Sequence, residues 1–282
     1  MALPSEFDLD AFVTHVLAED LGTGGDVTSN ATIPADTRFT AEINCREAII
    51  VAGLEIAAAF FRALDSEVRI EALVQDGYRA DAGTVLMRLA GNARAMLAAE
   101  RSALNTLQHL SGIATLTRKY VDAIAGTGAI LLDTRKTIPG LRALEKYAAR
   151  MGGAQNHRMR LDDGVLIKDN HVAVCGDVAE AVRRAGQANT GLPVQVEVDR
   201  IDQIEPALAA GADRLLLDNM PPTVLREAVA LVGGRVPLEA SGGVTLETIR
   251  AIAETDVDFI SVGRITQSAP AVDIGLDYAM NR

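Results

Sequence analysis

The chain has 282 residues, enough for one large domain or two smaller ones, and its 49% hydrophobic and 23% charged residues are ordinary for a globular protein. Two cysteines, Cys45 and Cys175, provide neither a disulfide framework nor a metal-ligand spacing. The first residues carry acids where a secretion signal needs positive charge, and no apolar run is long enough for a membrane span. We therefore expect a cytoplasmic protein without a membrane partner.

The formal net charge is −11, yet basic residues are concentrated in one stretch. Residues 101–171 contain eleven Lys and Arg against six Asp and Glu, and they include every lysine of the chain. A nucleic-acid-binding protein more often spreads basic charge over a whole face. A local concentration inside an acidic chain is more typical of a pocket for a small anion, so no nucleic-acid partner is expected.

The first hundred residues predict a small α+β domain. Strands are expected at 39–51 and 68–74, a helix at 53–64, and a further strand among the turns of 76–91. A long helix over 92–124 then connects to the rest of the chain. We divide the chain into an N-terminal domain over 1–110 and a C-terminal domain over 111–282, whose last residues could pack back on the first domain.

From about residue 129 onward, short apolar runs alternate with helix-length amphipathic stretches. Near-continuous Val, Ile and Leu indicate parallel strands that are buried on both faces, and helices are expected at 177–189, 201–211, 222–232 and 245–254. This alternation is typical of βαβ units around a parallel sheet.

Six strands are predicted, at 129–133, 165–168, 193–198, 214–218, 236–241 and 259–263. Each ends in or near a polar residue: Asp133, Lys168, Glu197, Asp218, Ser241 and Ser261. An α/β barrel builds its active site from several strand ends at one rim, whereas an open sheet uses one switch point. The pattern therefore favours a barrel. Six strands are visible in the sequence, so closure with seven or eight requires one or two more.

Cationic residues gather at these predicted strand ends and in the turns after them. Arg135 and Arg158 can each hold a carboxylate or phosphate through two N–H groups, while Lys136 and Lys168 act as point charges. Each alone could be a solvated surface charge, but together with His157 they predict an anion pocket. His171 lies in the same predicted rim loop and could contact a ligand, whereas His15 and His109 stand among helical residues and are expected to be packed or on the surface.

Glycines and acids on the later strands suggest a phosphate and metal site. Gly242, Gly243 and Gly263 follow the last two predicted strands, where backbone N–H groups of a barrel often hold phosphate, although turn formation is the alternative. Glu197 and Asp218 end consecutive strands and are the type of carboxylate that holds Mg²⁺, with salt bridges to nearby arginines as the alternative. Glu239 is a third acid nearby.

The sequence contains no nucleophile elbow, P-loop or dinucleotide fingerprint. Cations, glycines and two acids stabilise anions without supplying an obvious nucleophile. Lys168 is the exception, because a lysine that ends a barrel strand could form a Schiff base. A Schiff-base lyase and a non-catalytic anion-binding module therefore stand as alternatives to an enzyme that works without a protein nucleophile.

The chain resembles the quinolinate phosphoribosyltransferases along nearly its full length. The resemblance is carried by the segments EDLGTGGDVTS, ERSALNTLQHLSGIAT, DTRKTIPGLR, EKYAARMGGAQNHR, LIKDNH, VEVD, LLLDN, LEASGGV and ISVGRIT. It implies an α/β fold with a C-terminal α/β barrel, seven-stranded, and a smaller N-terminal α/β sandwich domain, assembled as a homodimer or larger homo-oligomer. It also implies that quinolinate and phosphoribosyl pyrophosphate react, with Mg²⁺, to give nicotinate mononucleotide, pyrophosphate and CO₂ in de novo NAD synthesis.

The resemblance further implies roles for particular residues. Arg101, Arg135, His157, Arg158 and Lys168 are expected around quinolinate, with Arg101 acting in the partner subunit. The phosphoribosyl pyrophosphate and its metal are assigned to Lys136, Glu197, Asp218, Ser241, Gly242, Gly243 and Gly263, among which Lys136, Glu197 and Asp218 are the expected catalytic residues. Thr134 and Ser261 are expected to bind substrate as well. Glu197 and Asp218 are the expected metal ligands.

Three positions depart from the family pattern: the MGGAQ turn, Arg264 and Gln267. They affect the expected phosphate end of the site. A related family associated with molybdate transport shares the fold, and the intact NHR and LIKDNH segments argue against that alternative.

Overall fold

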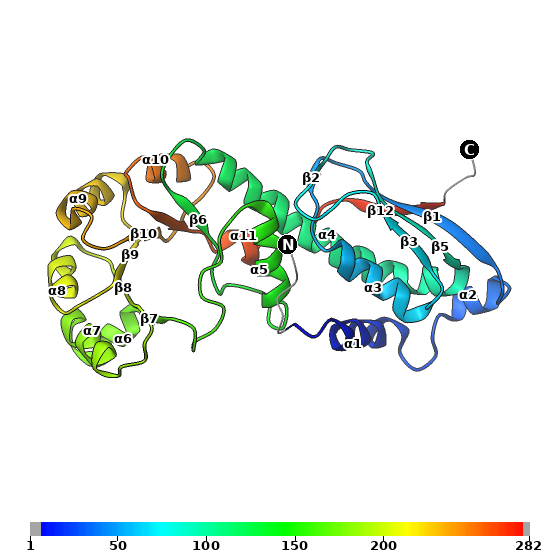
Figure 1. Cartoon of the computed structure of the whole chain (residues 1–282), viewed down its shortest axis with the longest axis horizontal. Helices are drawn as coiled ribbons and strands as arrows, with labels where there is room; N and C mark the ends of the chain where they lie inside the picture. Colours follow the sequence, from blue (N-terminus) through cyan, green and yellow to red (C-terminus); the bar gives the residue numbers. More distant parts are fainter. Residues whose placement is uncertain (1–6, 279–282) are drawn as a thin grey trace. The chain divides into compact units, whose positions relative to one another are not determined.

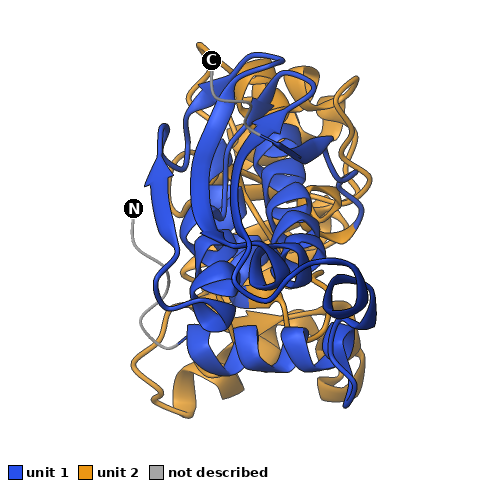
Figure 2. Cartoon of the chain, turned by 90° about the vertical axis from the view of Figure 1, so that its right-hand side faces the viewer, with its two compact units in different colours: residues 1–117, 143–153, 268–282 blue, residues 118–142, 154–267 orange. Residues whose placement is uncertain are grey.

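The computed structural model describes residues 7–278, and these form two compact units (Figures 1 and 2). The first unit contains residues 7–117, 143–153 and 268–278, and the second contains 118–142 and 154–267. The units are therefore interleaved along the chain, whereas the boundary drawn from the sequence is one cut after residue 110.

A four-stranded antiparallel sheet organises the first unit, in the order β12 (Ile274–Tyr278), β1 (Arg38–Cys45), β5 (Val85–Asn92) and β3 (Arg69–Ala72). Along β1, Ala41, Ile43 and Cys45 are buried and alternate with more exposed residues, as the two-residue period of a strand requires. The strand expected over 39–51 is interrupted after Cys45. Its last part, β2 (Ile49–Ile50), pairs with β4 (Arg79–Ala80) in a separate ladder.

Helices accompany this sheet in the first unit (Figure 1). They are α1 (Leu9–Leu21), α2 (Val27–Thr32), α3 (Leu54–Leu64), α5 (Arg142–Gly152) and the long α4 (Ala93–Ala123), which continues into the second unit. The carboxylates of Asp8 and Asp26 accept backbone N–H groups at the starts of α1 and α2, which is the usual N-cap interaction. Asp76 does the same for α3, because its carboxylate accepts the N–H groups of Gly53 and Leu54.

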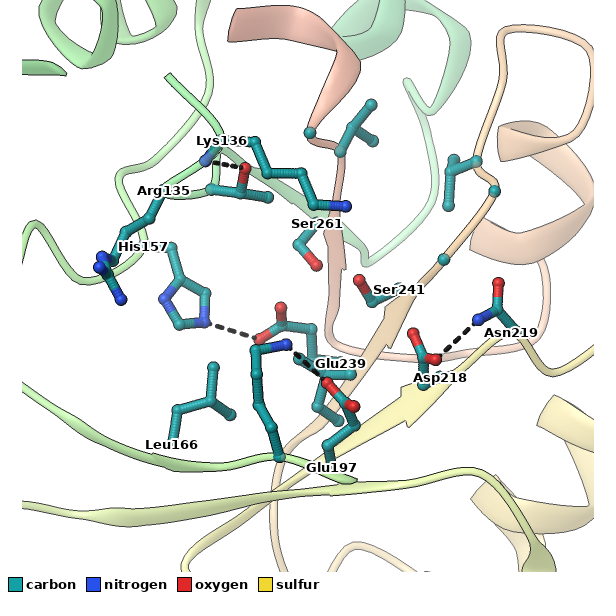
Figure 3. A pocket seen from close by; sticks show the side chains of 18 of the residues that line it. Arg135, Lys136, His157, Leu166, Glu197, Asp218, Asn219, Glu239, Ser241 and Ser261 are labelled. Atoms are coloured by element: carbon teal, nitrogen blue, oxygen red, sulfur yellow. Dashed lines mark hydrogen bonds and ion pairs between the residues drawn. The ribbon is translucent and has the colours of Figure 1, made fainter. Parts of the chain in front are cut away.

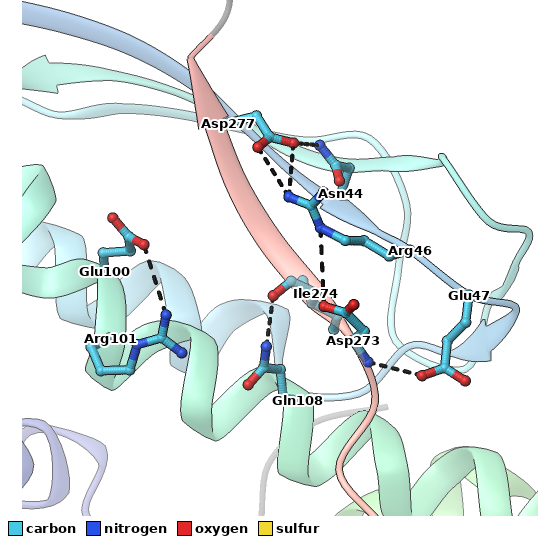
Figure 4. Close-up of polar contacts among 9 residues, drawn as sticks. All are labelled: Asn44, Arg46, Glu47, Glu100, Arg101, Gln108, Asp273, Ile274 and Asp277. Carbon is cyan, nitrogen blue, oxygen red and sulfur yellow. Dashed lines mark hydrogen bonds and ion pairs between the residues drawn. The ribbon is translucent and has the colours of Figure 1, made fainter.

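The last described strand, β12, belongs to the first unit and is attached there by polar contacts (Figure 4). Arg46 pairs with Asp277 at 3.0 Å, and the side chain of Gln108 donates to the carbonyl of Ile274 at 2.6 Å. The backbone N–H of Asp273 donates to Glu47 at 2.9 Å. These contacts connect β12 with α4 as well as with its sheet neighbour β1.

The second unit is built on a parallel sheet with the order β6 (Ile130–Leu132), β11 (Phe259–Ser261), β10 (Leu238–Ser241), β9 (Arg214–Asp218), β8 (Val194–Val198) and β7 (Val165–Ile167). All six strands expected from the apolar runs are present, and the expected α/β fold with a smaller N-terminal sandwich domain is confirmed. The N-terminal sheet is antiparallel, and the C-terminal α/β part is built on parallel strands. At the seventh position, beside β6, the structure has a single bridge between Leu132 and Gln155.

Helices connect these strands and lie outside the sheet (Figure 1). They are α6 (Asp169–Cys175), α7 (Val178–Gln187), the 3₁₀ turn η1 (Ile201–Gln203), α8 (Ile204–Ala209), α9 (Pro222–Val232), α10 (Ile249–Ala253) and α11 (Arg264–Gln267). None of the helices within residues 7–278 combines the length and apolar content needed to cross a bilayer.

The parallel register decides which side chains share the inner face of this sheet. Ser241 pairs with Asp218, Glu239 pairs with Leu216, and Glu197 pairs with Leu216 from the other side. Paired residues of neighbouring strands point to the same face, and residues two apart on one strand do so too. The polar ends of β8, β9 and β10 therefore project together, at the carboxyl edge of the sheet.

One glycine in α4 is required by close packing within the first unit. A Cβ atom at Gly112 would collide with the carbonyl oxygen of Pro270, in the segment that precedes β12. Gly112→Ala should therefore lower the free energy of unfolding by about 1–3 kcal/mol through overpacking. The measurement is urea or thermal unfolding of the full chain.

The matched control is Gly186→Ala, in α7, where an added Cβ meets no atom within 4 Å. Because alanine is the better helix former, this control should be neutral or stabilising by about 0.5–1 kcal/mol. Equal stability of the two variants would contradict the packing assigned to Gly112.

Candidate active site

A cavity of about 760 Å³ opens at the carboxyl edge of the parallel sheet (Figure 3). Its walls include every residue that the sequence assigned to substrate, metal or catalysis except Arg101 and His171: Thr134, Arg135, Lys136, His157, Arg158, Lys168, Glu197, Asp218, Ser241, Gly242, Gly243, Ser261 and Gly263. Arg264 and Gln267, two of the departures from the family pattern, also line it. The parallel register thus collects residues that lie more than a hundred positions apart.

The two exceptions lie elsewhere. Arg101 is exposed on α4, where its guanidinium lies 4.0 Å from Glu100 (Figure 4). It also donates to Asn105 at 3.2 Å. His171 lies in the first turn of α6, and its Nδ1 accepts the backbone N–H of Lys168 at 3.0 Å. This contact gives the backbone N–H of Lys168 an acceptor at the start of α6.

Positive charge in the cavity is crowded. Burial, followed by the neighbouring charge of Arg135, lowers the pKa of Arg158 below its ordinary value. The Arg158 guanidinium also donates to the carbonyl of Gly164 at 2.8 Å, which fixes the direction of its side chain. A bound anion would offset the unfavourable energy of two guanidinium groups in one partly buried space. This wall therefore suits a carboxylate or a phosphate.

His157 is held by one contact of its backbone and two of its ring. The backbone N–H of His157 donates to Asp133 at 2.8 Å, and the ring Nδ1 accepts the backbone N–H of Arg158 at 2.8 Å. The ring Nε2 lies 3.4 Å from Glu239 (Figure 3). Asp133 is fully buried and also accepts the side chain of Asn156, so this strand-end carboxylate holds the segment that carries His157.

Two carboxylates lie on the opposite side of the cavity from this segment (Figure 3). Burial and the charge of Glu197 raise the pKa of Asp218 above its ordinary value, while Asn219 donates to Asp218 at 2.7 Å. Glu197 pairs with Lys168 at 2.7 Å, whereas the salt-bridge alternative for these acids assumed arginine partners. Like-charged carboxylates at adjacent strand ends favour a cation between them.

These two carboxylates fit Mg²⁺, which proteins commonly hold through one or two carboxylates together with substrate phosphates. No cluster of three or more His, Cys, Asp or Glu suited to a metal occurs within residues 7–278. The donor set thus suits a metal that arrives with a phosphorylated substrate better than a metal enclosed by protein ligands alone.

Glycine is needed where the later strands leave the sheet. Gly242 has φ of +91°, and a Cβ there would lie 2.8 Å from the backbone nitrogen of Asn219. A Cβ at Gly263 would lie 2.7 Å from Cδ of Lys136. Both positions let neighbouring groups approach the backbone closely, as a phosphate-binding turn also requires.

Several residues of the site carry weak signals in the sequence. Asn219 adopts φ of +55° and contacts Asp218 and Gly242. The sequence Asn-Met-Pro-Pro predicts only a turn there and gives no sign of these contacts. Gln195 and Arg214 lie on the same inner face as Glu197 and Asp218, two and four positions earlier on their strands. A search for the two-residue period along β8 and β9 could have found both.

The chain matches the family model of the quinolinate phosphoribosyl transferase C-terminal domain over residues 113–277 and that of the N-terminal domain over residues 26–111. The chain belongs to the quinolinate phosphoribosyl transferase family.

Individual relatives align with this chain over almost the full length of both proteins. The nicotinate-nucleotide pyrophosphorylase (carboxylating) of Mycobacterium leprae is 44% identical, with 94% of this chain and 95% of that protein aligned. A probable enzyme of the same name from Bacillus subtilis is 41% identical over 98% and 96% of the two chains. The solved nicotinate-nucleotide pyrophosphorylase of Francisella tularensis superimposes with a TM-score of 0.93 at 40% identity, covering 99% of this chain and 100% of that one.

The raised pKa of Asp218 predicts that its charge destabilises the ligand-free quinolinate phosphoribosyl transferase fold. A carboxyl with a raised folded-state pKa adds stability below the unfolded value of about 3.9, and this stability is lost as the pH rises through the folded-state pKa. Asp218→Asn should therefore raise the Tm at pH 7.5 in the presence of a chelator, and the gain should shrink toward pH 4.

Asp199→Asn is the control, because Asp199 is an exposed carboxylate beside Arg200. It should change the Tm little at either pH. A lower Tm for Asp218→Asn at pH 7.5 would show that Asp218 stabilises the empty protein instead.

Proposed function

We propose that this chain transfers the phosphoribosyl group of phosphoribosyl pyrophosphate to quinolinate, with decarboxylation, in de novo NAD synthesis. The products are nicotinate mononucleotide, pyrophosphate and CO₂. The single observation that carries this proposal is the cavity wall of Arg135, Arg158, His157 and Lys168, facing two carboxylates across one space of about 760 Å³. A dianion suits the first wall, and a metal-bound pyrophosphate suits the second.

Quinolinate is assigned to the cationic wall. Arg135 and Arg158 present guanidinium groups that match carboxylates in shape, and Lys168 adds a point charge. Arg101, from the first unit of a partner subunit, would complete this set. The enzyme is accordingly proposed to work as a homodimer or larger homo-oligomer, in the cytoplasm, although plant relatives have names that specify chloroplasts or mitochondria.

Phosphoribosyl pyrophosphate is assigned to the remaining cavity residues. Lys136 and the turns at Gly242, Gly243 and Gly263 supply positive charge and close-approaching backbone, and the hydroxyls of Thr134, Ser241 and Ser261 lie along the same walls. Glu197 and Asp218 would hold Mg²⁺, which when bound neutralises the charge of the departing pyrophosphate.

The chemistry needs no protein nucleophile. The pyridine nitrogen attacks the anomeric carbon as the bond to pyrophosphate breaks, and a nearby carboxylate such as Glu197 stabilises the oxocarbenium character of that carbon. The nitrogen then carries a positive charge. When the adjacent C–CO₂⁻ bond breaks and CO₂ leaves, this charge stabilises the electron pair left on the ring carbon, and that pair then binds a proton. The protein mainly brings two anions together that would otherwise repel each other.

Schiff-base chemistry at Lys168 is disfavoured by the site. A lysine nucleophile must lose its proton, and the ion pair with Glu197 at 2.7 Å favours the protonated ammonium form. The non-catalytic alternative makes a different prediction, tight binding of phosphoribosyl pyrophosphate without turnover.

The direct test is an assay of the purified chain with carboxyl-labelled quinolinate, phosphoribosyl pyrophosphate and Mg²⁺. Equal amounts of labelled CO₂ and nicotinate mononucleotide are expected. Binding of both substrates without either product would overturn the proposed function.

Substrate choice gives a sharper prediction. Nicotinate lacks the second carboxylate, so it forms fewer charge-assisted hydrogen bonds with the Arg135, Arg158 and Lys168 wall than quinolinate does, and each such bond contributes about 1.5–3 kcal/mol. The kcat/KM for nicotinate should be lower than that for quinolinate by about a hundredfold or more. Comparable values for the two acids would contradict the assignment of this wall.

The position of Arg101 can be tested by subunit exchange. Arg101→Ala and Glu197→Ala should each be inactive, because each removes one proposed part of every site. If Arg101 acts in the partner's site, a mixed dimer has one intact site and one with both lesions. Random exchange makes half of the dimers mixed, so about a quarter of wild-type activity should return. Zero activity after demonstrated exchange would place Arg101 in the site of its own chain.

A further inference from the structure

A buried charged group lines the floor of the cavity, on the inner face of the parallel sheet. Glu239 of β10 has no exposed surface, and its Oε2 atom accepts the side-chain amide of Gln195 at 2.8 Å. The guanidinium of Arg214 lies 2.7 Å from the same oxygen. Barrel interiors are usually filled by branched apolar side chains, so a polar layer at this depth calls for a function.

The layer balances its own charge. Burial acts to raise the pKa of Glu239, but hydrogen bonds from His157 and Ser261 and the positive charge of Arg214 outweigh burial and hold the pKa below its ordinary value. Arg214 is the matching cation, and its guanidinium stacks 3.9 Å from the centroid of the Phe259 ring. Because Arg214 already compensates the Glu239 carboxylate, a second positive charge on His157 is not needed.

The hydrogen bonds of His157 specify its protonation. Its Nδ1 accepts the backbone N–H of Arg158 at 2.8 Å, and a nitrogen that accepts such a bond carries no proton. The proton of the neutral ring is then on Nε2, which faces the Glu239 carboxylate at 3.4 Å. The hydrogen bond made by one ring nitrogen determines whether the other nitrogen carries the proton.

We propose that Glu239 is a positioning residue that holds His157 as the neutral ring with its proton on Nε2. The Nδ1 of that ring then fixes the backbone N–H of Arg158, and with it the start of the Arg158 side chain. Resting on the proposed function, this assigns the charge recognition of quinolinate to Arg135, Arg158 and Lys168. His157 contributes the carbon edge of its ring and the placement of Arg158, in place of a positive charge.

Nuclear magnetic resonance of the full-length chain tests this directly. Long-range ¹H–¹⁵N spectra of histidine-labelled protein distinguish the two neutral tautomers and the charged ring, and His157→Gln identifies the signals of His157 among the four histidines. At pH 7.5 the substrate-free protein should show Nε2 protonated and Nδ1 unprotonated. A charged ring, or a proton on Nδ1, would overturn the proposal whether or not the chain turns over quinolinate.

Two double variants separate positioning by Glu239 from simple packing. Glu239→Met with Arg214→Met removes both charges and the acceptor for Nε2, and replacing a buried ion pair by apolar residues is often tolerated. Glu239→Gln with Arg214→Met removes the same charges but keeps a side-chain oxygen as acceptor. Only the first should lose the single tautomer of His157.

Kinetics should follow the spectra. The first variant should raise the KM for quinolinate by about tenfold, as loss of a carboxylate that orients a histidine typically does. Its KM for phosphoribosyl pyrophosphate should change less than about twofold, and the second variant should stay near wild type for both. Identical behaviour of the two variants would show that Glu239 only fills space.

Should the first variant fail to fold, the wild-type spectrum and the second variant still decide the question. A second variant that folds but loses the tautomer would overturn the proposal, because it retains the acceptor. Absence of turnover in the wild type would defeat the proposed function while leaving the spectroscopic result intact.

Discussion

Partial burial of charged groups beside like charges, at the carboxyl edge of the parallel sheet, is the constraint on which the rest of this structure depends. Burial and Arg135 lower the pKa of Arg158 on one side of the cavity, and burial and Glu197 raise the pKa of Asp218 on the other. Both shifts disfavour the charge that each group carries at neutral pH. Stability supplied by packing elsewhere in the chain must offset this penalty, which a bound anion on one wall and a cation on the other would relieve.

Lys168 connects the two sides. Its ammonium group pairs with Glu197, so one cation of the wall proposed for quinolinate is held against one acid of the wall proposed for phosphoribosyl pyrophosphate. Binding of a metal at Glu197 would compete with this pair and make Lys168 available to a carboxylate. Binding of the two substrates would therefore be coupled through a single side chain.

The depth of the site comes from the alternation of side chains along the strands. Positions at the strand ends reach the cavity, and the positions two and four residues earlier form the layer of Gln195, Glu239 and Arg214 beneath it. This layer supports His157 from below, while Asp133 holds the backbone of the same residue. Rigid strands thus position a segment that has no regular structure of its own.

Sequence patterns predicted much of this arrangement. The six inner strands were visible because each is an apolar run that closes near a polar residue, and α4 was visible as one long amphipathic stretch. The break after Cys45 was not, because the apolar residues of 49–51 continue the strand pattern while the ladder partner changes. The seventh barrel position was not visible either, since a single bridge at Gln155 requires no apolar run.

Within the site, charge and strand ends predicted the residues whose side chains reach the cavity. The sequence did not predict that Arg214 and Gln195 are part of a buried polar layer. Both interrupt apolar runs, and a polar residue at such a position is ordinarily assigned to the surface. Lys146, which has no exposed surface in α5, departs from the same expectation. Arg101 carried no local signal, and its assignment came from the family resemblance, whereas His171 was assigned from its place in the predicted rim loop.

A crystal structure of the chain with quinolinate bound tests the central claim most directly. We expect one carboxylate of the ligand against Arg135 and Arg158, Lys168 drawn to the ligand, and the His157 ring still on Glu239 through Nε2. Quinolinate bound outside this cavity, or bound there with its carboxylates turned away from Arg135 and Arg158, would contradict that claim.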